Sequence, residues 1–114
     1  MRIDISARGF RVTPELRTYV LRRLHFKLGR FSDRIDLARV RIVEVNGPRG
    51  AVDLHCRIQV LGPDVDGLVT SALAANLRSA IDRAADHMHC AVGRELARTS
   101  EKRRRRRPSH ARLP

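Results

Sequence analysis

Basic side chains recur at helical spacing in two parts of the sequence. In the first set, Arg23, Lys27, Arg30 and Arg34 are spaced by four, three and four residues, and Arg17 and Arg22 flank them. The second set consists of Arg83, His87, Arg94 and Arg98. Such spacing places the members of a set on one side of a helix. A phosphate backbone requires this kind of array, because each fixed cation neutralises one phosphate and releases a counterion.

Rows of charge are also the ordinary solvated faces of helices, and that alternative stays open here. Binding is favoured by the near absence of acids around the first set, since Asp33 is the only one between residues 16 and 35; solvated faces usually mix both signs. The second set is weaker, because residues 58–100 contain more acidic than basic side chains. Further cations fall on predicted strands, namely Arg39, Arg41 and Arg57. We expect the two helices to lie side by side, so that the two sets could form one cationic surface.

The C-terminal segment is a separate source of positive charge. Its basic run consists of Lys102, Arg103, Arg104, Arg105, Arg106 and Arg107. A run of like charges without apolar periodicity predicts disorder, and it suits RNA, DNA, heparin or anionic lipid equally well. The alternative is a solubilising end with no dedicated target.

Metal binding and catalysis find little support in the residue patterns. His87 and Cys90 have the spacing of ligands on one face of a helix. The other candidate donors, His55 and Cys56, point to opposite faces of a predicted strand. The sequence also lacks a glycine-rich phosphate loop, a nucleophile elbow and paired acids on a shared face. We expect no enzyme, no metal or other cofactor, and no small-molecule substrate.

Length and composition restrict the class of protein. The chain has 114 residues, enough for one domain with a single core, and a formal net charge of +12. No stretch approaches the roughly 20 apolar residues that a membrane span needs, and the N-terminus is unlike a secretory signal. Two cysteines are too few for a disulfide framework. These features predict a reduced, cytoplasmic protein with an anionic partner and no membrane association.

The apolar periodicity predicts the elements that must position these cations. Strands are expected at residues 2–6, 37–45, 52–60 and 65–73, and helices at 14–29 and 77–98. Residues 52–60 alternate apolar and polar side chains, which is typical of a strand with one buried face. The segment 65–73 could instead end where a helix starts at Ser71, but Asn76 is the better helix cap.

The first helix has a clear start and a clear buried row. Thr13 can cap the free amides and Pro14 suits the first helical position. The residues that recur every four positions are Leu16, Val20, Leu24 and Leu28. The order β-α-β-β-β-α predicts an α+β fold in which a four-stranded sheet has two helices packed on one face. Residues 1–99 are expected to form the domain, and residues 100–114 a disordered basic tail.

With these residues in view, residues 1–98 resemble the ribosome hibernation-promoting factor and ribosome-associated inhibitor family, also labelled sigma-54 modulation proteins. Thr13-Pro14-Glu15-Leu16-Arg17 is similar to the family's opening of the first helix. Asn76-Leu77-Arg78-Ser79-Ala80-Ile81-Asp82 stands where the family has Asp-Met-Tyr-x-Ala-Ile-Asp. Asn46-Gly47-Pro48-Arg49-Gly50 with Cys56-Arg57 resembles a short-form subgroup.

The resemblance implies docking on small-subunit ribosomal RNA in the channel that mRNA and tRNA use, so that the protein inhibits translation by occupation. It implies a monomer away from the ribosome and a role in the stress response. The residues that it assigns to RNA contacts are Arg17, Arg23, Lys27, Arg83, Arg94 and Arg98. Two other functions remain open: a regulator that binds a sigma factor, and a general DNA or nucleoid binder driven by the tail.

The chain also departs from the family pattern. His87 and Cys90 stand where the family has Lys and Arg, and Arg78 replaces an aromatic residue. One residue is inserted near Phe26, which affects the register of Lys27 and Arg30. The long-form second domain is not expected, and the tail is basic rather than acidic.

Overall fold

A computed structural model describes residues 1–46 and 52–106. A four-stranded sheet contains β1 (Arg2–Arg8), β2 (Leu37–Asn46), β3 (Val52–Leu61) and β4 (Leu68–Ala74) in the spatial order β1-β2-β3-β4. β1 runs parallel to β2, and the other pairs are antiparallel. The helical elements are α1 (Pro14–Leu28), the 3-10 helix η1 (Gly29–Arg34) and α2 (Leu77–Arg106). The predicted α+β fold is therefore confirmed.

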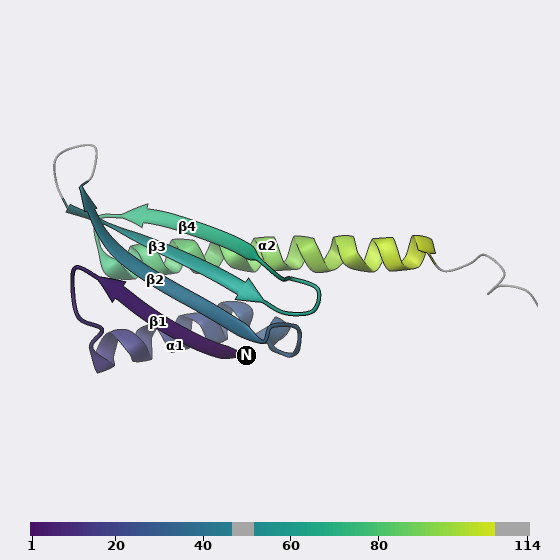
Figure 1. Ribbon diagram of the computed structural model, residues 1–114, viewed down its shortest axis with the longest axis horizontal. Coiled ribbons are helices and arrows are strands. Elements are labelled where there is room, and N and C mark those ends of the chain that lie inside the picture. Colours follow the sequence, from purple (N-terminus) through teal and green to yellow (C-terminus); the bar gives the residue numbers. More distant parts are fainter. Residues whose placement is uncertain (47–51, 107–114) are drawn as a thin grey trace, which may run out of the picture.

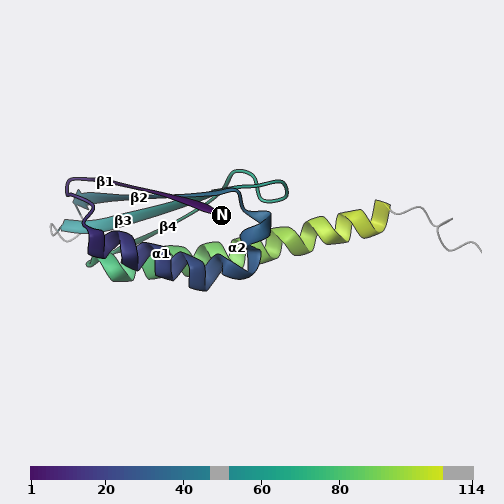
Figure 2. The ribbon, with the colours of Figure 1, turned by 90° about the horizontal axis from the view of Figure 1, so that it is seen from below.

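Both helices cover the same face of the sheet. Figure 2 shows α1 and α2 side by side beneath the strands, while no described helix covers the opposite face of the sheet. α2 passes beyond the end of the sheet, so that its C-terminal part projects from the body (Figure 1). No helix within the described ranges is both long and apolar enough to cross a bilayer.

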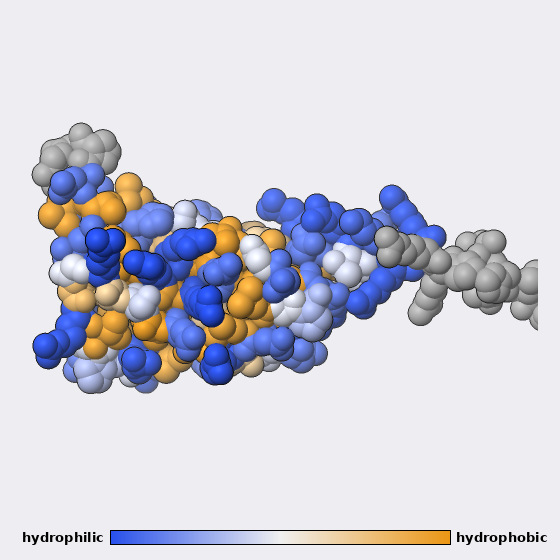
Figure 3. All heavy atoms as spheres, in the orientation of Figure 1, coloured by the Kyte–Doolittle hydropathy of each residue, from blue (hydrophilic) through white to orange (hydrophobic). Residues whose placement is uncertain are grey.

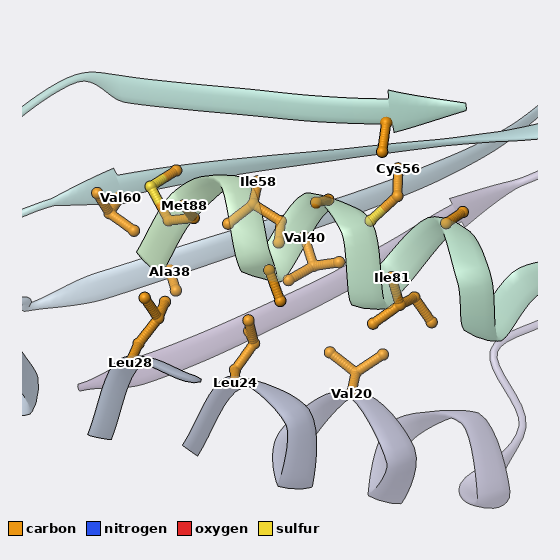
Figure 4. Packing of buried hydrophobic residues seen from close by; sticks show 14 of the residues in the cluster. Val20, Leu24, Leu28, Ala38, Val40, Cys56, Ile58, Val60, Ile81 and Met88 are labelled. Atoms are coloured by element: carbon orange, nitrogen blue, oxygen red, sulfur yellow. The ribbon is translucent and has the colours of Figure 1, made fainter. Parts of the chain in front are cut away.

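The core lies between the helices and the sheet. The predicted row Leu16, Val20, Leu24 and Leu28 is buried. Leu24 and Val20 point toward Val40 and Ile81, so both helices and the sheet share one core (Figure 4). Burying such a side chain completely stabilises the fold by about 1.5–3 kcal/mol.

The caps of both helices form as the sequence predicts. Oγ1 of Thr13 accepts a 3.1 Å hydrogen bond from the backbone N–H of Leu16. Oδ1 of Asn76 accepts one of 2.9 Å from the backbone N–H of Ser79. Each cap satisfies a backbone donor that the helix leaves without a partner.

Two predicted boundaries were wrong by three residues or more. The last strand begins at Leu68 rather than at residue 65, because Gly67 has a φ of +79° and turns the chain just before it. α2 continues to Arg106, eight residues beyond its predicted end and into the segment expected to be disordered. Arginine is a good helix former, and i,i+4 pairing of Arg105 with Glu101 supports this extension. The tail beyond residue 106 and the predicted hairpin loop at residues 47–50 lie outside the described residues.

Candidate nucleic-acid interface

The seam between α1 and α2 holds two of the predicted cations. Nε of Arg23 lies 2.9 Å from Oδ1 of Asp82, an ionic contact that is not aligned as a hydrogen bond. Nζ of Lys27 lies 2.6 Å from Oδ1 of Asp86. The hydroxyl of Tyr19 donates a 2.6 Å hydrogen bond to Asp82. These contacts join the helices, and they leave the side chains of Arg23 and Lys27 only 32% and 26% exposed.

The contacts in the seam shift the pKa values of Asp86 and Tyr19. The hydrogen bond from Lys27 holds the pKa of Asp86 below its usual value. This carboxylate therefore stays ionised at neutral pH and keeps its ion pair with Lys27. Burial, and then the hydrogen bond to Asp82, raise the pKa of Tyr19. The Tyr19 phenol therefore remains a hydrogen-bond donor at neutral pH.

Phe26 is a candidate contact residue that sequence reasoning missed. Its side chain is 75% exposed, the most exposed of the large apolar residues in the described chain. The guanidinium of Arg23 lies 5.7 Å from the Phe26 ring centroid, and the ammonium of Lys27 lies 5.6 Å from it. An exposed aromatic ring beside cations is the combination on which nucleic-acid bases stack. The signal in the sequence was the lone aromatic residue between basic ones in an otherwise aromatic-poor chain.

The other predicted cations of the first set do not all lie together. Arg22 and Arg30 are exposed, and the Arg30 guanidinium lies 5.2 Å from the Phe31 ring centroid. Arg17 is also exposed, but it is six residues from Arg23, which corresponds to about 120° around the helix. Arg17 therefore lies on the other side of the buried row from the seam.

The second set faces away from α1. Nη1 of Arg83 donates to the carbonyl oxygen of Leu73 at 3.3 Å, and Nδ1 of His87 lies 3.2 Å from the carbonyl oxygen of Ser71. Both carbonyls belong to β4, which is an edge strand, so these contacts satisfy backbone groups that an edge leaves free. Arg94 is exposed on the same side of α2.

The helices lie side by side as expected, but these contacts turn the two sets toward different neighbours. Asp82 and Asp86 occupy the side of α2 that faces α1, and they separate Arg23 and Lys27 from the second set. Spacing within a helix showed which cations share a face, but it did not show toward which neighbour that face would turn.

The extended end of α2 carries the basic run. Its exposed cations are Lys102, Arg103, Arg104 and Arg105. Arg103 pairs with Asp64 at 2.9 Å, Arg34 also contacts Asp64, and Arg98 pairs with Glu95 at 2.6 Å. The hydrogen bond from Arg34, followed by the charge of Arg103, lowers the pKa of Asp64. Strongly hydrophilic side chains cover this arm in Figure 3. Arg106 is helical, and Arg107 lies outside the described residues.

In the part of the chain that the structure describes, the cysteines and histidines do not assemble a metal site. Within residues 1–46 and 52–106, no three His, Cys, Asp or Glu side chains come close enough to hold an ion. Cys56 is buried in the core, and burial raises the pKa of its thiol to about 12, whereas Cys90 is exposed.

Comparisons with known proteins agree with this architecture. The family model described as sigma 54 modulation protein / S30EA ribosomal protein matches residues 3–104. The N-terminal domain of Thermus thermophilus Protein Y is similar in structure, with a TM-score of 0.68, 27% identity, and coverage of 82% of this chain and 98% of that one. A ribosomal subunit interface protein from Coxiella burnetii has the same fold, with a TM-score of 0.70, 17% identity, and coverage of 85% and 99%. No curated protein matches the sequence. Because the matching model spans most of the sequence, the chain belongs to the sigma 54 modulation protein / S30EA ribosomal protein family.

Proposed function

We propose that this protein associates with the ribosome, docks on small-subunit ribosomal RNA through basic residues of its helices, and inhibits translation by occupying the channel used by mRNA and tRNA. The observation that carries the proposal is membership of a family whose description names a ribosomal protein.

The outer side of α1 is the first part of the proposed contact. Arg22 and Phe26 are exposed there, and the exposed Arg30 follows in η1, directly after the helix. Guanidinium groups bind phosphate oxygens in a planar fork. The ring of Phe26 offers a face on which an unpaired base can stack. Phosphate and base contacts on one helix surface suit a folded RNA with unpaired segments better than they suit a regular duplex.

The projecting end of α2 is the second part. Lys102, Arg104 and their neighbours lie on a helix that extends past the core, so they can reach RNA that the body does not touch (Figure 1). Their attraction is independent of sequence and is weakened by salt. We infer that the arm adds affinity, while the α1 surface fixes the orientation of the domain.

Inhibition by this route needs no chemical step. A compact α+β body bound between RNA elements excludes other ligands by volume alone. This view agrees with a site of cations and one aromatic ring rather than nucleophiles, and with the expectation that the protein is not an enzyme.

Co-sedimentation with purified small ribosomal subunits between 50 and 200 mM salt tests the proposal. Arg22→Gln/Arg30→Gln and Phe26→Ala should each weaken binding, the latter by about 1–3 kcal/mol if one base stacks on the ring. Arg11→Gln, which removes an exposed charge from the connector before α1, is the control and should bind like the unchanged protein. Failure of the unchanged protein to sediment with subunits at 50 mM salt would exclude the proposed function.

The family description also names modulation of sigma 54, and that is the second candidate function. If a sigma factor is the target, Arg22→Glu/Arg30→Glu should alter binding to the isolated sigma subunit and leave ribosome binding unchanged. The opposite pattern supports the ribosomal function.

A further inference from the structure

The face of the sheet opposite the helices carries a cluster of arginines. Arg39 and Arg41 lie two residues apart on β2, so both point to this face. Arg57 on β3 is the direct cross-strand partner of Arg41. All three side chains are exposed. They line a cavity of about 350 Å³ together with Asp4, Ile5, Ser6, Val40 and Gln59.

The cluster lacks the internal partners that the seam cations have. Among the described residues, no carboxylate lies within salt-bridge distance of Arg39, Arg41 or Arg57, whereas Arg23 and Lys27 each contact an aspartate. Directly opposed like charges on neighbouring strands destabilise a sheet. An external anion would relieve this repulsion, because it can bind both guanidinium groups at once.

The lining of the cavity defines the chemistry of that anion. Guanidinium groups bind phosphate oxygens in a bidentate manner. Ser6, in register with Arg41, and Gln59, in register with Arg39, add polar groups that can donate hydrogen bonds. Pockets for small molecules are lined mostly by apolar and aromatic side chains that enclose the ligand. Aromatic side chains are missing from this lining, so nothing here would hold the base of a free nucleotide.

The cationic surface also extends beyond the cavity. The exposed positions of β1 alternate along the strand, and they place Arg2, Asp4 and Arg8 on the same side as Ser6, with Asp4 in register with Arg39. Figure 3 views the uncovered face of the sheet and shows separate strongly hydrophilic side chains standing among apolar ones. A series of cations along neighbouring strands fits an extended chain of phosphates better than one small ion.

We propose that the uncovered face of the sheet is a second RNA-binding surface, on which Arg39, Arg41 and Arg57 bind backbone phosphates. The proposal rests on the ribosomal RNA function given above and adds a separate contact to it. The helices bind on one side of the domain and the sheet on the other, so the protein is held between two RNA segments.

Single substitutions measure the contribution of the sheet. Arg41→Gln and Arg57→Gln are compared with Arg11→Gln, which removes the same charge from the connector, in salt titrations with purified small subunits. Each lost phosphate contact should lower the slope of log affinity against log salt by about 0.7–0.9, and Arg11→Gln should leave it unchanged. Between 50 and 200 mM salt, the unchanged protein should then lose about threefold more affinity than either variant.

The outcomes separate this proposal from the proposed function. If Arg22→Gln/Arg30→Gln weakens binding but Arg41→Gln and Arg57→Gln behave like Arg11→Gln, the sheet surface is refuted and the ribosomal function stands. If the unchanged protein does not bind small subunits at all, the proposed ribosomal function is itself refuted. Titration with AMP should give no binding; AMP binding that Arg57→Gln abolishes, without any effect on subunits, would assign the cavity to a small phosphate ligand and refute the RNA contact.

Tethered cleavage locates the surface directly. Ser71 on β4 is exposed and lies in register with Arg57. In the variant Ser71→Cys/Cys90→Ser an iron chelate attaches only at position 71, because the thiol of Cys56 is buried. We expect hydroxyl radicals to cut ribosomal RNA near this position. Cys90→Ser alone carries no chelate and gives the background, and cleavage that does not exceed this background overturns the proposal.

Discussion

If α1 binds RNA as proposed, Asp86 competes with RNA for the Lys27 ammonium, and removing Asp86 should strengthen RNA binding. The Asp86 carboxylate lies 2.6 Å from the ammonium of Lys27 in the seam between the helices. Lys27 also lies against the exposed ring of Phe26, where we place the RNA contact. Asp86→Asn removes the acidic competitor and leaves a side chain of nearly the same shape, so Lys27 becomes available to a phosphate.

The size of the effect follows from counterion release. One additional phosphate contact increases the slope of log affinity against log salt by about 0.7–0.9, which corresponds to about a threefold larger change in affinity between 50 and 200 mM salt. The loss of folding stability should be small, about 0.2–1 kcal/mol, because the side chains of Lys27 and Asp86 are 26% and 53% exposed. Affinity and stability should therefore move in opposite directions.

Salt titrations with small subunits measure the affinity, and urea unfolding measures the stability. Asp66→Asn is the matched control, because Asp66 is exposed in the turn before β4 and forms no ion pair among the described residues. It produces the same change in net charge without releasing a cation. If Asp86→Asn and Asp66→Asn give equal slopes, Lys27 does not contact RNA and the seam plays no part in binding.

Three further predictions concern the scaffold. Gly62→Ala places a Cβ 2.2 Å from the carbonyl oxygen of Arg34, so urea unfolding should show a loss of about 1–3 kcal/mol; a variant as stable as the unchanged protein would contradict this packing. A thiol reagent at neutral pH should modify Cys90 at once and Cys56 only after unfolding, because burial raises the pKa of Cys56 to about 12, and rapid reaction of both would show that the core is open. The Asp86 ion pair stabilises the fold fully above the ordinary pKa of 3.8, and this contribution is lost as the pH falls through the lowered pKa of Asp86. Asp86→Asn should therefore flatten the acid side of the plot of unfolding free energy against pH. An unchanged plot would rule out this ion pair as a contributor to stability.

Local patterns were sufficient to predict the fold. The alternation in residues 52–60 and the four-residue recurrence from Leu16 to Leu28 each identify an element and its buried side, because burial imposes the period of the backbone on the sequence. Thr13 and Asn76 mark helix starts for the same local reason. The end of α2 could not be predicted in this way, since a run of arginines is compatible with either helix or disorder.

The site depended on contacts that a linear sequence does not show. Arg23 and Asp82 are 59 residues apart, so helical spacing alone could not reveal that one neutralises the other. The opposition of Arg41 and Arg57 likewise depends on the register of β2 against β3. Sequence spacing identified the candidate cations, whereas the packing of the helices and strands decides which of them are free of ion pairs within the fold.

The helical arm at the end of α2 has a geometric consequence. Successive residues of a helix are turned by about 100° from one another, so Lys102, Arg104 and Arg105 form a partial ring of charge around the arm, while Arg103 turns to Asp64 of the body. A flat anionic surface could engage only part of such a ring. We infer that RNA folded around the free sides of the arm would engage more of these cations than a flat surface could, and because the arm is already helical, it need not give up the freedom of an unfolded chain to bind there.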